Sequence, residues 1–270
     1  MRSTLLLFLL TISIAISSCN QTTTEITAEL KPLKHQREFY QLKIYTFDTD
    51  DQVRVTDDYL KNAYLPGLKK LGIDKVGVFK PRPETEDTVQ RTYVLVPFVS
   101  LEQMQHLEEN LLKDESYLAS GSNYIHASYD KPPYRRIESV ILRAFEDMPS
   151  MQIPKLEGPR AHRIYELRSY ESPTESYYRN KVDMFNAGGE VKLFDRLAFN
   201  AVFYGEVISG SNMPNLMYMT TFKDQESRDA HWKAFGEAPE WKELIAMPKY
   251  EHNVSHADII FLFPTEYSDY

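Results

Sequence analysis

Apolar residues recur along the chain with two spacings, a period of two that is typical of strands and a period near 3.6 that is typical of helices. In the first half, these patterns predict strands at 38–47, 76–80, 91–98 and 137–145, and helices at 53–71 and from Ser100 to about Leu111. In the second half, they predict strands at 162–171, 199–208, 216–222 and 257–263, and helices at 174–187 and from Asp224 to beyond Trp241. Each half therefore has the order β-α-β-β-α-β, the ferredoxin-like arrangement, and the chain is predicted to be an α+β protein.

Two local signals refine the helices of the first half. Segment 100–103, Ser-Leu-Glu-Gln, fits a capping box, in which the serine oxygen accepts a free backbone N–H at the start of a helix. Pro66 and Gly67 fall inside the helix predicted at 53–71. Proline lacks an N–H and clashes with the preceding turn, so this dipeptide is a candidate break in that helix.

A short repeat relates the two halves. Segment 39–45, Phe-Tyr-Gln-Leu-Lys-Ile-Tyr, matches segment 164–170, Ile-Tyr-Glu-Leu-Arg-Ser-Tyr, 125 residues later. Tyr93 and Tyr218 have the same separation, and each lies in a predicted strand that leads into a helix. Two units of one fold are the simplest explanation.

The N-terminus has the features of an export signal. A single arginine precedes an apolar run at 5–16, which is too short to cross a bilayer as a helix. The sequence Ile-Ser-Ser-Cys at 16–19 resembles a bacterial lipobox, so residues 1–18 are predicted to be a signal peptide and Cys19 the lipidated residue. The alternative is an ordinary secretory signal that ends near Ser18. Either signal predicts an exported protein, and the lipobox places it at the cell envelope, attached to the membrane through Cys19.

The mature chain is predicted to consist of a tether and two folded units joined by a linker. Residues 19–36 are polar and have no sustained periodicity, so they are interpreted as a flexible tether. The first ferredoxin-like unit is assigned to 37–147 and the second to 161–270. Between them, 148–160 is rich in proline and weakly periodic, as expected of a linker.

Composition excludes several classes of function. The formal net charge of −8 argues against a nucleic-acid partner, because phosphate binding requires a concentrated basic surface. One cysteine excludes a disulfide framework and any cysteine-rich metal or iron–sulfur site. The 10 glycines form no dinucleotide-binding or phosphate-binding loop, and no cofactor is expected.

Several segments of the sequence resemble the NIPSNAP family. These segments are 65–73 and 76–79 in the first half, and 165–170 and 238–241 in the second. The resemblance covers most of residues 37–264 and implies a dimeric α/β-barrel, in which two ferredoxin-like sheets pack through their open faces. Here two tandem units in one chain are expected to form that barrel, and a homo-oligomer is a further possibility. The resemblance carries over no catalytic residue.

The candidate pocket comes from alternation along the predicted strands. On 162–171, one face carries Glu166, Arg168 and Tyr170, which are expected to face the barrel interior if Leu167 faces the helices. Such a set would bind or protonate a small oxygenated ligand, and the alternative interpretation is a structural ion pair between Glu166 and Arg168. The full candidate set is Glu166, Arg168, Tyr170, Asn200, Tyr204, Lys43 and Tyr45. The residues of the first half are the weaker equivalents, so that unit is expected to be mainly structural.

A histidine pair near the C-terminus is a candidate metal site. His252 and His256 have the spacing of two ligands on one side of a helix, but the segment leads into a predicted strand. No metal site is therefore predicted there.

Three functions fit these observations. The favoured hypothesis is a membrane-anchored protein that binds a small, partly apolar molecule in the barrel interior. The second is a cofactor-light monooxygenase or isomerase, in which Arg168 orients an anionic substrate and Tyr170 or Glu166 transfers a proton. The third is a non-enzymatic envelope scaffold with a dry, filled interior.

Overall fold

The computed structural model describes residues 36–84 and 89–270. The predicted signal peptide, Cys19 and all but the last residue of the predicted tether lie outside the described residues. The strands are β1 (Phe39–Phe47), β2 (Gly77–Pro81), β3 (Gln90–Phe98), β4 (Arg136–Ala144), β5 (Ile164–Glu171), β6 (Phe203–Ser209), β7 (Asn215–Phe222) and β8 (His256–Pro264).

Helices separate and flank these strands in both halves. The helical segments of the first half are α1 (Asp50–Tyr59), η1 (Leu60–Tyr64), α2 (Leu65–Lys70), α3 (Leu101–Gln105), α4 (Leu107–Leu111), α5 (Glu115–Ser120) and α6 (Ser122–Ile125). Those of the second half are η2 (Arg160–His162), α7 (Glu175–Phe185), α8 (Glu190–Arg196), α9 (Gln225–Glu237), α10 (Pro239–Ile245) and η3 (Pro248–Tyr250). Among the described residues, no helix is both long and apolar enough to span a membrane.

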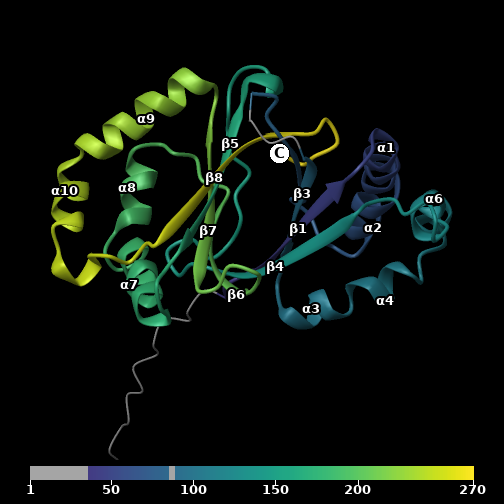
Figure 1. Cartoon of the computed structure of the whole chain (residues 1–270), viewed down its shortest axis with the longest axis horizontal. Coiled ribbons are helices and arrows are strands. Elements are labelled where there is room, and N and C mark those ends of the chain that lie inside the picture. The colour runs from purple at the N-terminus through teal and green to yellow at the C-terminus, as the bar shows by residue number, and fades with distance from the viewer. Residues whose placement is uncertain (1–35, 85–88) are drawn as a thin grey trace, which may run out of the picture. The chain divides into compact units, whose positions relative to one another are not determined.

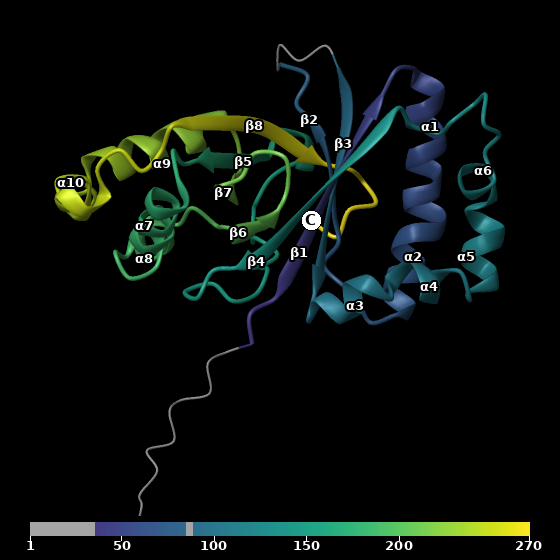
Figure 2. The ribbon, with the colours of Figure 1, turned by 60° about the horizontal axis from the view of Figure 1, so that its bottom comes forward.

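The strands form one closed antiparallel barrel in the order β1-β3-β2-β8-β5-β7-β6-β4. Within it, the first half contributes β4-β1-β3-β2 and the second half β8-β5-β7-β6, which is the same ferredoxin-like order in both. The halves join where β4 pairs with β6 (Figure 1) and where β2 pairs with β8 (Figure 2). The predicted fold class, two tandem ferredoxin-like units that pair as a dimeric α/β-barrel, is therefore confirmed.

The two junctions between the halves are short. β1 pairs with β3 over nine residues, from Phe39 with Phe98 to Phe47 with Gln90. By contrast, β2 and β8 pair over three residues, and the β4–β6 pairing has an irregularity between Ile141 and Leu142. Side chains of both halves packed inside the barrel therefore add to the backbone pairing at the junctions.

Alternation along each strand divides its side chains between the barrel interior and the helices. On β1, Tyr40 and Leu42 belong to the interior cluster, whereas Tyr45 packs with the helices of the first half. On β5, Tyr165 and Leu167 point inward in the same way. The helices of each half cover the outer face of that half's own strands (Figure 2).

The helix predicted at 53–71 is continuous in spite of Pro66. A π-helical turn, η1, precedes the proline, and α1, η1 and α2 follow one another without a gap from residue 50 to residue 70. A π turn widens the helix locally and accommodates the missing N–H, so the chain continues in a helical path. The candidate break at Pro66 and Gly67 is therefore wrong.

The other differences from the predicted elements are local. Helices α5, α6 and α8 were not predicted, since each is only four to seven residues long. β6 begins at Phe203 rather than at residue 199, because Ala198 and Asn200 adopt positive φ angles of 57° and 45° and interrupt the extended chain. In the capping box, Ser100 Oγ accepts the N–H of Gln103 as expected, at 3.1 Å.

Candidate functional site

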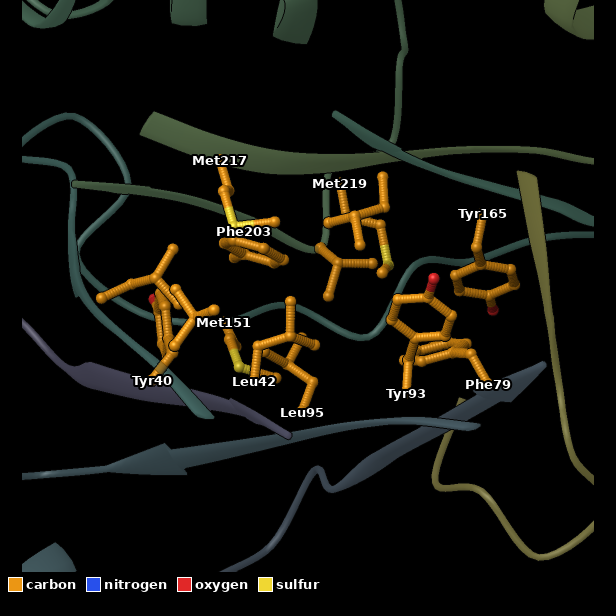
Figure 3. Packing of buried hydrophobic residues seen from close by; sticks show 14 of the residues in the cluster. Tyr40, Leu42, Phe79, Tyr93, Leu95, Met151, Tyr165, Phe203, Met217 and Met219 are labelled. Atoms are coloured by element: carbon orange, nitrogen blue, oxygen red, sulfur yellow. The ribbon is translucent and has the colours of Figure 1, made fainter. Parts of the chain in front are cut away.

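The barrel interior is filled by apolar side chains from both halves. Figure 3 shows Leu42 and Leu95 of the first half facing Phe203 and Met219 of the second. Leu167 is 1% exposed within this cluster. Because side chains alternate along β5, the inward position of Leu167 sends Glu166, Arg168 and Tyr170 to the opposite face, toward the helices. The expectation that these residues face the barrel interior is therefore wrong. They do not line a pocket inside the barrel.

In the second half, Glu166 is the centre of a buried ionic cluster. Its side chain is fully buried, and Arg168 Nε donates to its Oε1 at 2.7 Å. From α9, Arg228 Nε donates to Oε2 at 2.8 Å and Trp232 Nε1 donates to the same oxygen at 3.0 Å. Two guanidinium groups and an indole thus saturate this carboxylate, which is how a buried charge is normally stabilised.

Arg168 is held on its other sides as well. Its guanidinium carbon lies 3.8 Å from the centroid of the Trp232 ring, in a cation–π contact. Nη1 donates to Tyr170 Oη at 2.8 Å, and the Tyr170 and Tyr218 hydroxyls are 2.9 Å apart. The ion pair weighed from the sequence as a structural alternative is present, and it fixes Arg168 in one position.

A second buried ion pair lies beside this cluster. Lys181 Nζ is 3.0 Å from Glu190 Oε2, and both side chains are about 5% exposed or less. Burial raises the pKa of Glu190, and the neighbouring Lys181 ammonium opposes that rise. A cavity of about 350 Å³ opens next to Arg168, Tyr170 and Lys181. Its cations already have carboxylate partners, so little positive charge is left for a ligand.

The two remaining predicted residues of the second half, Asn200 and Tyr204, do not join Glu166, Arg168 and Tyr170 in a pocket. Asn200 is exposed and precedes β6, so it does not share a strand face with Tyr204. Tyr204 is buried against Phe185 and Tyr218, and its pKa is raised well above the ordinary value by burial. The structure thus does not bring the seven predicted residues together in one pocket.

The first half has a larger cavity on the equivalent face of β1. It has a volume of about 610 Å³ and includes Lys43, so we call it the Lys43 cavity. The Lys43 ammonium lies 5.1 Å from the centroid of the Tyr64 ring and 5.8 Å from that of Tyr45. Within the parts of the chain that the structure describes, no carboxylate forms an ion pair with Lys43. Lys43 is therefore a half-buried cation without a counter-charge from residues 36–84 and 89–270.

Tyrosines from three elements surround Lys43. Tyr59 comes from α1, Tyr117 from α5 and Tyr124 from α6, and all three line the cavity. The hydroxyls of Tyr59 and Tyr117 are 2.9 Å apart, and the Tyr59 and Tyr124 rings stack with centroids at 3.8 Å. Tyr64, at the end of the π turn, is 2% exposed, and its hydroxyl has no partner in the structure.

Electrostatics make the Lys43 cavity a positive site. Burial alone would lower the pKa of Lys43, but the hydroxyls of Tyr64 and Tyr45 keep it above the ordinary lysine value. Burial raises the pKa of Tyr64 to about 12, and it also raises the pKa of Tyr117. At neutral pH the cavity therefore contains an ammonium and neutral phenols. Glu108 is the one carboxylate among its lining residues, and that side chain is exposed.

Aliphatic side chains complete the cavity and give it an apolar wall. They belong to Met104, Leu107, Leu111, Leu112, Ile125, Pro132, Pro133 and Ile137. One charged group among aromatic and aliphatic walls is the usual composition of a small-molecule pocket.

Sequence reasoning identified Lys43 and Tyr45 but ranked them below the residues of the second half. It missed Tyr59, Tyr64 and Tyr117, because a chain with 18 tyrosines gives no signal that singles these out. Only the packing of α1, η1 and α5 on β1 brings them to Lys43. The first unit, which the sequence predicted to be mainly structural, contains the better pocket.

Comparison with known proteins supports the fold of the whole chain and a family resemblance in its second half. The NIPSNAP family model matches residues 165–269. A proposed monooxygenase from Fusobacterium nucleatum is 11% identical, with a TM-score of 0.55 and coverage of 85% of this chain and 93% of that chain. Another from Lactobacillus acidophilus is 12% identical, with a TM-score of 0.54 and coverage of 84% and 94%. Identities this low show the fold alone. Among curated proteins, no sequence matches this chain.

Proposed function

Alongside the match of residues 165–269 to the NIPSNAP family model, we propose that this chain binds a small organic anion with an apolar, ring-containing body in the Lys43 cavity of its first half. The observation that carries the proposal is the Lys43 ammonium, which has no carboxylate partner in the described chain and lies among aromatic rings. A half-buried charge without a partner is unfavourable, and a ligand anion would supply the missing counter-charge. The aromatic and aliphatic walls favour an apolar body on the same ligand.

The composition of the cavity favours binding over a reaction. A general base must lose its proton near the working pH, and the raised pKa values of Tyr64 and Tyr117 keep these phenols neutral. The cavity has no histidine among its lining residues, and its carboxylate, Glu108, is exposed. The monooxygenase description of the two structural neighbours is therefore not extended to this chain.

A series of naphthalene probes tests the charge and the body of the ligand separately. Binding of 1-naphthoate, 1-naphthalenemethanol and 1-naphthylmethylamine to residues 36–270 would be measured by isothermal titration calorimetry. We expect naphthoate to bind at least about tenfold more tightly than the alcohol, a difference of about 1.4 kcal/mol, and the amine not to bind.

Two variants locate the site. Lys43→Met should reduce naphthoate affinity to that of the alcohol, because it removes the charge and keeps the length of the side chain. Lys113→Met is the matched control, since Lys113 is an exposed lysine of the same half that pairs with Glu109 outside the cavity. Equal naphthoate affinity in the wild type and Lys43→Met would contradict the proposal.

We also propose that the protein is held at the cell envelope by a lipid on Cys19. The support is the sequence at 16–19 alone, since these residues lie outside the described part of the chain. Metabolic labelling with an alkyne fatty acid tests it, because labelling of the wild type should be lost in Cys19→Ser. An unlabelled wild type would leave the ordinary secretory signal as the explanation.

A further inference from the structure

Three potential metal ligands meet at one end of the barrel, outside the Lys43 cavity. Glu171 ends β5, and His256 and Asp258 lie at the start of β8. One donor atom of each lies within 4.8 Å of the others, and His256 Nε2 is 3.0 Å from Asp258 Oδ1. Glu171 pairs across the sheet with His256, and Asp258 pairs with Ser169. All these side chains therefore share one face of neighbouring strands.

A buried amide on the next strand adds an independent observation. Asn215 begins β7, pairs across the sheet with Glu171 and is 3% exposed. Its Nδ2 donates to Ser169 Oγ at 2.9 Å, so its side chain lies on the same face as the three ligands. Its Oδ1 is buried and receives no hydrogen bond from the described part of the chain. A buried carbonyl oxygen without a donor is costly, and a cation or a cation-bound water beside it would remove that cost.

We propose that Glu171, His256 and Asp258 bind a divalent transition metal ion of the zinc type at this end of the barrel. Two carboxylates and an imidazole are ligands of Zn²⁺, whereas the hard ions Mg²⁺ and Ca²⁺ favour oxygen ligands alone. Zinc holds such ligands at about 2.0–2.2 Å, so donor atoms within 4.8 Å of one another need only side-chain rotation to converge on one ion. The fourth position would be open to water.

This site differs from the histidine pair considered in the sequence. A metal shared by His252 and His256 requires a helix, but His256 starts a strand and His252 lies in the preceding turn with a φ of 57°. His256 instead meets a carboxylate from a strand that is distant in the sequence, which no local spacing predicts. His252 is exposed and is not part of the cluster, so it is a natural control.

The test is zinc binding by the protein without a polyhistidine tag. Competition with a zinc-responsive dye should show one site in residues 36–270, and Zn²⁺ should raise the melting temperature, as a ligand of the folded state does. His256→Ala and Asp258→Asn should each weaken binding by at least about tenfold, the loss that even second-layer partners of a metal cause. His252→Ala should bind as the wild type does.

The outcomes separate the proposal from its alternatives. His256 is exposed, so the metal-free melting temperature of His256→Ala should equal that of the wild type. Cobalt substitution gives a second measurement, because the visible absorption of bound Co²⁺ should disappear in His256→Ala and remain in His252→Ala. Failure of the wild type to bind Zn²⁺ below millimolar concentration, or equal binding by wild type and His256→Ala, would overturn the proposal. Neither result bears on naphthoate binding at Lys43.

Discussion

Lys43 and Arg168 occupy the same position in the two halves of the barrel, 125 residues apart, but among the described residues only Arg168 has a carboxylate partner. The difference comes from the residue two positions earlier on the same strand face. Glu166 neutralises Arg168, whereas Gln41 lies next to Lys43 and donates instead to Ser139 Oγ at 2.8 Å. One repeated strand has thus produced a closed ionic cluster in one half and an unpaired cation beside a cavity in the other.

A carboxylate placed beside Lys43 should compete with an anionic ligand and lower its affinity. In Gln41→Glu, we expect the new carboxylate to pair with Lys43 as Glu166 pairs with Arg168, and naphthoate affinity to fall by at least about tenfold, or about 1.4 kcal/mol. Calorimetric titration measures the change. Ser139→Ala is the control, because it removes the partner of Gln41 without adding charge. Unchanged affinity in Gln41→Glu would show that Lys43 does not carry the binding energy.

Replacing Glu166 by glutamine, the reverse of Gln41→Glu, should destabilise the second half. Glu166→Gln leaves the guanidinium groups of Arg168 and Arg228 without a buried counter-charge, and we expect the free energy of unfolding to fall by about 3–5 kcal/mol. Urea denaturation followed by tryptophan fluorescence measures it, since Trp232 also bonds to Glu166. Asp229→Asn removes an exposed neighbour of Arg228 and should change stability little. A loss below about 1 kcal/mol would mean that the cluster contributes little to the fold.

Truncating a side chain inside the filled barrel should lower stability without affecting the Lys43 cavity. Leu167→Ala should lower the free energy of unfolding by about 2–5 kcal/mol, because the surrounding side chains from both halves cannot all collapse into the space. It should leave naphthoate binding unchanged, since the Lys43 cavity lies on the other side of the sheet. If Leu167→Ala instead altered binding as Lys43→Met does, the ligand would lie inside the barrel.

Acid should weaken the N-terminal cap that Asp114 forms on α5, the helix that carries Tyr117 of the Lys43 cavity. Hydrogen bonds from Lys70 and Ser116 lower the pKa of Asp114 from 3.8 to about 2. Because the folded-state pKa is the lower one, Asp114 contributes stability above about pH 4, and this contribution is lost as the pH falls through about 2. Asp114→Asn should therefore be less stable than the wild type at pH 7, and most of the difference should be gone at about pH 2. Urea midpoints at both values check this, with Glu115→Gln, an exposed neighbour, as the control.

The barrel was predictable from sequence because it rests on patterns repeated along the chain. The alternation on 39–45 and 164–170 and the shared order of elements are enough to define two ferredoxin-like units. Which face of each strand points into the barrel was not predictable in the same way. Arg168 and Glu166 look like pocket residues in an alternating pattern, and only the packing of Trp232 and Arg228 on them shows that they are satisfied.

The site was harder to predict because it depends on contacts between distant segments. Tyr117 and Tyr124 come from short helices that the periodicity did not reveal, yet they form part of the wall beside Lys43. The π turn that brings Tyr64 to Lys43 likewise has no clear sequence signal other than Pro66, which was interpreted as a break. The metal ligands on β5 and β8 meet only through strand pairing.

The division of the barrel into equal halves predicts how one half behaves alone. In the fragment 36–147, the inner faces of β1, β3 and β4 would expose apolar side chains such as Leu42, Leu95 and Leu142. Such a surface is unstable in water, and the partner that fits it best is a second copy, with β2 of each fragment pairing beside β4 of the other. Light scattering coupled to size-exclusion chromatography should therefore give the mass of a dimer. Leu95→Lys in the fragment should prevent that association, and a folded, soluble monomer of the unmodified fragment would show that the interior contacts between halves are dispensable.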